Sequence, residues 1–135
     1  MANRRQFIQA SAALSALPIS AIAPSALAAA SPMSIYKVVF DSRFEPGRAF
    51  GAQAASRGWT TAAIQGDVTD LWFHDLDLRW RQGPIALVGL TAHNSLFCLE
   101  RLAWDVGLRV VARDDLEGTP LVVWTIAPPN RTVRA

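Results

Sequence analysis

The chain has 135 residues, which is room for one domain rather than two. Hydrophobic residues make up 51% and charged residues 18%, a composition that excludes an intrinsically disordered chain. Its formal net charge of +2 comes from the N-terminus, because without Arg4 and Arg5 the 13 basic residues fall to 11 and balance the 11 acidic ones. The remainder therefore shows no basic excess of the kind that binds nucleic acid.

Residues 1–30 have the features of an export signal. Arg4 and Arg5 are followed by Phe7 and then by a weakly apolar stretch, which ends in Ala-Leu-Ala-Ala-Ala at residues 26–30. A basic start, a short apolar stretch and a small-x-small end are typical of a cleavable secretory signal. A membrane anchor is disfavoured, because a span needs about 20 strongly apolar residues and Ser, Ala and Pro dilute this stretch.

The arginine pair followed by Phe7 and Ile8 resembles the twin-arginine (Tat) signal of exported bacterial proteins. The resemblance implies that the chain folds before export and reaches the periplasm or another exported location, without a stable membrane anchor after cleavage. We expect cleavage before Ala29 or before Ser31, which leaves residues 31–135 as one small domain.

Apolar runs and helix-like segments alternate along the rest of the chain. β-Branched and aromatic runs predict strands, and apolar residues spaced three or four apart before a glycine predict helices. The predicted strands cover residues 35–40, 60–65, 85–90, 108–112 and 121–126, and the predicted helices cover residues 42–58 and 95–106. This alternation is typical of βαβ units. We therefore expect an α/β domain with a small, mostly parallel sheet of four or five strands and helices on both faces, a minimal doubly wound arrangement.

Residues 68–82 carry two conflicting patterns. Trp72, Leu76 and Trp80 are spaced four apart, which favours a helix, whereas residues 75–81 alternate between polar and apolar, which favours a strand. We expect a short helix to about Asp75 and an irregular or extended continuation.

Polar residues follow the predicted strands, where open α/β sheets bind their ligands. These residues are Asp41, Asp67, Thr91, His93 and Asn94. The topology is expected to bring them to one edge, where His93 is the natural general acid or base and an aspartate is its orienting partner. The alternative is structural: Asp67 and Thr91 cap helices, and Asp41 forms a surface ion pair with Arg43.

The sequence predicts no metal site and identifies no cofactor. It has no His-Glu-x-x-His pattern, no paired cysteines and no glycine-rich phosphate loop after a strand. Asp70 and His74 are close enough to share a ligand if they lie on a helix, but the charges of this stretch are more simply a solvated face.

Cys98 is the only cysteine, so an intrachain disulfide is impossible. It has apolar neighbours on a predicted helix, and we expect it to be buried as a small hydrophobic residue. The alternative is a reactive thiol near the start of that helix.

The strand–helix–strand segment around this cysteine carries a further pattern. Its residues are Gly89 and Thr91, then Cys98, Glu100, Ala103 and Asp105, then Gly107 and Val110. The pattern resembles the nucleophile region of isochorismatase-like cysteine hydrolases, which implies Cys98 as the nucleophile and Asp41 as the catalytic aspartate. The spacings on both sides of the helix differ from the family's. The family's catalytic lysine has no counterpart, because the only lysine, Lys37, lies inside the first predicted strand.

Tryptophan and arginine are unusually common. The chain has five tryptophans, and after residue 30 it has ten arginines but one lysine. Both types are enriched at protein–protein interfaces. The densest group is made of Trp72, Arg79, Trp80 and Arg81. It predicts a protein partner, and the alternative is core packing combined with a codon bias toward arginine.

Two classes of function follow from these observations. The leading hypothesis is a small exported accessory or interaction module, such as a partner subunit of a larger exported protein, because no complete catalytic set is present. The alternative is a small enzyme or ligand-binding domain that uses the polar strand ends, or a degenerate isochorismatase-like hydrolase.

The export hypothesis predicts a mature N-terminus at Ala29 or Ser31 in mass spectra of protein taken from the cell envelope. Substituting Arg4→Lys together with Arg5→Lys should abolish export, because the twin-arginine route depends on that pair. Unchanged export of the double variant would contradict a twin-arginine signal and leave the general secretory route.

Overall fold

The computed structural model describes residues 34–129, and the predicted signal at residues 1–30 lies outside the described residues. A five-stranded sheet with the strand order β2-β1-β3-β5-β4 forms the centre of the described region. Its strands are β1 (Ile35–Asp41), β2 (Thr61–Ile64), β3 (Ala86–Ala92), β4 (Arg109–Asp115) and β5 (Leu121–Ala127). The five predicted strands are therefore confirmed.

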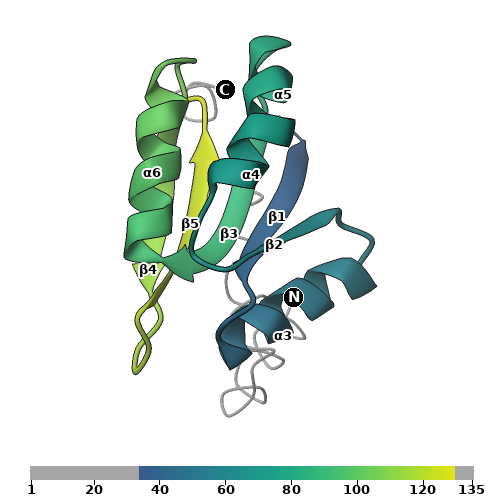
Figure 1. Ribbon diagram of the computed structural model, residues 1–135, viewed down its shortest axis with the longest axis vertical. Coiled ribbons are helices and arrows are strands. Elements are labelled where there is room, and N and C mark those ends of the chain that lie inside the picture. Colours follow the sequence, from purple (N-terminus) through teal and green to yellow (C-terminus); the bar gives the residue numbers. More distant parts are fainter. Residues whose placement is uncertain (1–33, 130–135) are drawn as a thin grey trace, which may run out of the picture.

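Helices pack against both faces of the sheet, and Figure 1 shows two of them side by side on one face. The first is α6 (His93–Trp104). The second, here called the 69–81 helix, is a continuous stretch made of α4 (Thr69–Leu71), the π-helical turn η1 (Trp72–Leu76) and α5 (Asp77–Arg81). These two helices form the helical layer. On the opposite face, α3 (Glu45–Ser56) packs against β1 and β2.

Alternating side chains of the strands supply two separate cores. Val39 lies beneath the helical layer with Leu99 and Trp124, whereas its neighbour Val38 lies on the other face with Phe50 of α3. All five side chains are at most 2% exposed. The near-continuous apolar runs of β1, β3 and β5 follow from this burial on both faces.

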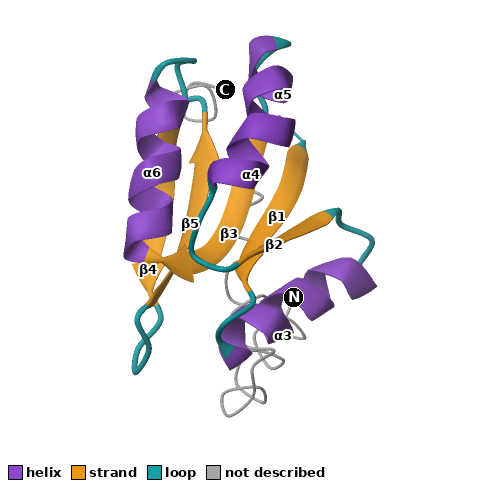
Figure 2. Ribbon diagram, viewed as in Figure 1, coloured by secondary structure: helices purple, strands orange, loops and turns teal. Residues whose placement is uncertain are grey.

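The prediction of a mostly parallel sheet is wrong. β1 pairs in parallel with β2 and β3, but β5 pairs antiparallel with both β3 and β4, so the sheet is mixed. The reason is the connection between β4 and β5, which spans only residues 116–120. A parallel crossover needs a dozen residues or more, so this short turn forces an antiparallel neighbour. β5 lies between β3 and β4 (Figure 2).

The prediction for residues 68–82 is also wrong, because the helix does not stop near Asp75 but continues to Arg81. Its inward side chains recur every four residues: Val68, Trp72, Leu76 and Trp80 all belong to the core under the helical layer. An ordinary α-helix with 3.6 residues per turn rotates such a row by about 40° at each step. The π-helical turn adds the extra residue that keeps the row facing the sheet.

Trp124 of β5 packs directly over Gly89 of β3, its partner across the antiparallel pair. A Cβ atom on residue 89 would lie 2.2 Å from Cζ2 of the indole, so only glycine fits beneath the ring. The indole N–H donates a hydrogen bond of 3.0 Å to Oγ1 of buried Thr91. This contact joins the centre of the sheet to the end of β3, where the candidate site begins.

Candidate functional site

The carboxyl ends of four strands meet at one edge of the sheet. β1, β2 and β3 are parallel, and β4 runs in the same direction because it and β3 are both antiparallel to β5. The chain leaves β1 toward α3 on one face and leaves β3 toward α6 on the other. Such a divergence creates the crevice in which open α/β sheets bind ligands. It lies between the ends of β1 and β3.

Asp41 is the buried charge of this crevice, and Arg43 neutralises it. The side chain of Asp41 is 0% exposed and that of Arg43 is 47% exposed. Three donors of Arg43 bond the carboxylate: the backbone N–H and Nε to Oδ1, both at 3.0 Å, and Nη2 to Oδ2 at 2.8 Å. Burial alone would raise the pKa of Asp41, but these bonds lower it below its ordinary value. The carboxylate therefore stays ionised, and both of its oxygens accept hydrogen bonds from Arg43.

The loop between β2 and α4 closes the crevice. A Cβ on Gly66 would lie 2.7 Å from Nη2 of Arg43, so the guanidinium rests against the bare backbone of this glycine. Ser95 of α6 donates a hydrogen bond of 2.8 Å from Oγ to the carbonyl oxygen of Gly66. The loop is thus held from β1 on one side and from α6 on the other. These contacts place Arg43 and the Gly66 loop at the edge where the topology predicts a ligand.

Asp67 lies in the turn just before the 69–81 helix. Its Oδ1 accepts bonds from the backbone N–H of Thr69 at 2.9 Å and from Oγ1 of the same residue at 2.6 Å. The side-chain and backbone bonds from Thr69 lower the pKa of Asp67. The N-cap position itself is Val68, which has no side-chain cap, so Asp67 orders the turn before the helix rather than occupying the cap position.

His93 does not face either of the predicted orienting aspartates. Its Nε2 lies 3.2 Å from Oδ1 of Asp115, at the end of β4, and both side chains are exposed. Thr91 is buried. Its hydroxyl accepts the hydrogen bond from the Trp124 indole and donates one of 3.0 Å to the carbonyl oxygen of Ala92. Asn94 is exposed beside His93. The predicted polar residues thus share an edge, but they form separate contacts rather than one catalytic group.

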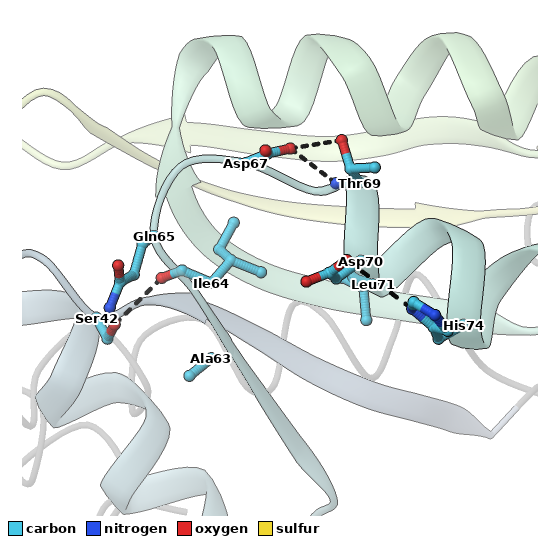
Figure 3. A pocket seen from close by; sticks show the side chains of 9 residues that line it. All are labelled: Ser42, Ala63, Ile64, Gln65, Asp67, Thr69, Asp70, Leu71 and His74. Carbon is cyan, nitrogen blue, oxygen red and sulfur yellow. Dashed lines mark hydrogen bonds and ion pairs between the residues drawn. The ribbon is translucent and has the colours of Figure 1, made fainter.

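An open pocket of about 710 Å³ lies beside this edge, between the end of β2 and the start of the 69–81 helix (Figure 3). Its titratable side chains are Asp67, Asp70 and His74, and Nδ1 of His74 lies 3.9 Å from Oδ1 of Asp70. The other lining residues are Ser42, Ala63, Ile64, Gln65, Thr69 and Leu71. The helical spacing noted for Asp70 and His74 therefore places both at one pocket.

A second polar cluster, missed by the sequence analysis, lies at the opposite end of β1. Asp75 accepts a hydrogen bond of 2.6 Å from the hydroxyl of Tyr36 and another from Nζ of Lys37. The hydrogen bond to Asp75, reinforced by burial, raises the pKa of Tyr36. Burial opposes ionisation of Asp75, but the bonds from Lys37 and Tyr36 lower its pKa below the ordinary value.

Two backbone irregularities bring this cluster together. The register of β1 against β3 shifts between Ile35 and Lys37, so that two consecutive side chains of the strand reach the same carboxylate. Asp75 itself lies in the π-helical turn. Neither irregularity is visible as a motif, although a lone lysine inside an apolar strand is a sign that it has a partner.

Cys98 is exposed, so the prediction that it is buried is wrong. Leu96 and Leu99 turn toward the sheet, and the 100° step of the helix therefore directs Cys98 to solvent. The isochorismatase-like arrangement also requires a free aspartate at position 41, whereas both carboxylate oxygens there are bonded to Arg43.

The tryptophan–arginine group predicted as a binding patch is not one exposed surface. Trp80 is only 3% exposed, because it packs in the core. Trp72 is half-buried against it, with ring centroids 5.9 Å apart. Arg79 is half-buried and Arg81 is exposed. Trp80 is therefore a core residue and not an interface anchor.

Within residues 34–129, no group of three or more His, Cys, Asp or Glu side chains is arranged to hold a metal ion. No helix of this part of the chain is long and apolar enough to span a membrane. No protein-family model, curated protein or solved structure matches the chain.

Substituting Asp41→Asn should lower the free energy of unfolding at pH 7 by about 1–3 kcal/mol, because a buried charged hydrogen-bond set is broken. The pKa of Asp41 in the folded state is lower than in the unfolded chain, where it is about 3.9. The stability that the ionised carboxylate contributes is therefore present above about pH 3.9 and is lost as the pH falls through the pKa of the folded state. The deficit of the variant should therefore shrink between pH 7 and pH 3 in urea titrations. Glu45→Gln, which alters an exposed pair with Arg48, is the control and should change little. A deficit independent of pH would contradict the assignment.

Proposed function

We propose that this chain is an exported accessory protein that binds a protein partner through the outer surface of its helical layer. Export rests on the twin arginines and the small-residue cleavage site of the N-terminus. Binding rests on the distribution of exposed apolar side chains. The partner is expected to be a larger exported protein that crosses the membrane with this chain.

One observation carries the proposal. Within residues 34–129, the large hydrophobic side chains that are exposed all lie on the two helices of the helical layer: Phe73 at 69%, Leu78 at 63%, Phe97 at 60% and Trp104 at 44%. Scattered exposed apolar residues are normal, but their restriction to one layer is typical of an interaction surface. We call Phe73, Leu78, Phe97 and Trp104 the helical-layer patch.

Trp104 has the surroundings of an interface anchor. The guanidinium carbon of Arg101 lies 4.7 Å from the centroid of its ring, and that of Arg109 lies 5.2 Å away. Cation–π contacts with two arginines restrain the exposed indole before binding, which lowers the entropy lost when a partner covers it. Tryptophan and arginine are the residue types that dominate binding energy at interfaces.

The enzyme alternative has less support. A general acid or base at His93 needs a reacting atom nearby and an orienting partner, and the partner of His93 is an exposed carboxylate outside the crevice. The crevice itself holds the buried ion pair of Asp41 and the loop around Gly66. An isochorismatase-like reaction at Cys98 also lacks the family's lysine.

The proposal predicts that Phe97→Asp combined with Trp104→Asp removes a stoichiometric partner from affinity-purified protein isolated from its native cells. Both side chains are exposed, so the variant should unfold at nearly the wild-type temperature. Ala52→Asp, an exposed apolar-to-acidic change on α3, is the matched control and should keep the partner. Retention of every partner by the double variant would contradict the proposal.

A further inference from the structure

The two edges of the sheet differ in how they are protected. The β4 edge carries Arg109 and Arg113, two aspartates at its end, and a register irregularity between Val110 and Ala112. Charges and bulges are the means by which proteins prevent pairing at an exposed edge. The β2 edge, Thr61–Ile64, has no charged residue, no proline and no register shift. The β4 edge therefore carries features that oppose pairing with a further strand, and the β2 edge carries none of them.

The pairing of β2 with β1 shows which backbone groups remain free. The carbonyl oxygens of Thr60 and Ile64 accept bonds from Val38 and Ser42 of the β1 side. In a sheet, alternate residues direct their N–H and C=O to the same side, so Thr61 and Ala63 direct theirs away from β1. Within the described residues, no strand pairs with that outer side.

The pocket continues from this free edge. Ala63 and Gln65 line it from the β2 side, and the titratable side chains on the other side are Asp67, Asp70 and His74 (Figure 3). The carboxylate of Asp70 is 96% exposed, and no lysine or arginine lines the pocket. A strand added along β2 would place a side chain at this pocket, and the two carboxylates favour a positive charge there.

We propose that the outer edge of β2 binds an extended peptide segment by strand addition, with a lysine or arginine side chain of that segment in the adjacent acidic pocket. Backbone bonds to Thr61 and Ala63 supply affinity, and the pocket supplies specificity for a basic residue. This site is separate from the helical-layer patch and does not depend on it.

The test uses the ¹⁵N-labelled full chain and two synthetic peptides of about eight residues, both with alternating threonine and valine and capped ends. One peptide has a central arginine, and the other has glutamate there. The arginine peptide should shift the amide signals of Thr61, Ala63 and Gln65, and the glutamate peptide should bind at least about tenfold more weakly. Absence of shifts at millimolar peptide, or equal binding of both peptides, would overturn the proposal.

Two substitutions separate the backbone from the charge. Ala63→Pro removes an outward N–H from an edge strand, a position that tolerates proline, and should weaken binding at least about tenfold. Asp70→Asn should weaken the arginine peptide only, whereas Asp114→Asn on the β4 edge should leave it unchanged. If Ala63→Pro fails to fold, a peptide N-methylated at alternate residues tests the same backbone bonds, and undiminished binding would refute strand addition.

Two further measurements separate peptide binding from self-association of the chain and from the helical-layer patch. If the same amide signals shift with protein concentration in the absence of peptide, the edge is occupied by a second copy of the chain, and the peptide proposal is wrong. The Phe97→Asp and Trp104→Asp double variant should bind the arginine peptide normally. The proposal for the helical-layer patch and the proposal for the β2 edge can therefore be refuted independently of each other.

Discussion

The ion pair between buried Asp41 and Arg43 organises the strand-end edge on which the rest of the structure depends. It neutralises the one carboxylate that the sheet buries completely. The guanidinium supports the loop at Gly66, and Ser95 of α6 holds that loop from the other side. Gly47 of α3 packs so closely on the carbonyl oxygen of Asp41 that a Cβ there would lie 2.1 Å away. The backbone and side chain of Asp41, its partner Arg43 and the loop at Gly66 thus join β1, α3 and α6 at this edge.

The contacts at the strand ends bear on where the two proposed binding surfaces lie. In doubly wound proteins the crevice between diverging strand ends binds the ligand, but here it contains a neutralised carboxylate and a packed glycine loop. The proposed binding surfaces lie outside it. The helical-layer patch presents Phe97 and Trp104 for a folded partner, and the free edge at Thr61–Ile64 presents backbone groups for an extended one.

Local patterns predicted the elements well because strands and helices follow from burial periodicity. They did not predict strand order, which depends on the turn at residues 116–120, although its shortness already excluded a parallel crossover. The four-residue spacing of Trp72, Leu76 and Trp80 does not fit a regular α-helix, and the π-helical turn accounts for it. Cys98 is exposed because Leu99 faces the sheet, and the 100° step between neighbouring helical residues turns Cys98 away from it. The contact of Lys37 with its carboxylate depends on two tertiary irregularities that no local pattern contains.

The central claim is that Arg43 holds the buried strand-end carboxylate of Asp41 in its ionised form as part of the fold. The pKa of the Asp41 carboxyl group, followed by carbon-13 NMR during an acid titration of the folded chain, tests this most directly. A structural, arginine-bound carboxylate should titrate below the ordinary value of about 3.9. A value raised well above that, as in carboxyl groups that serve as general acids in desolvated sites, would contradict the account.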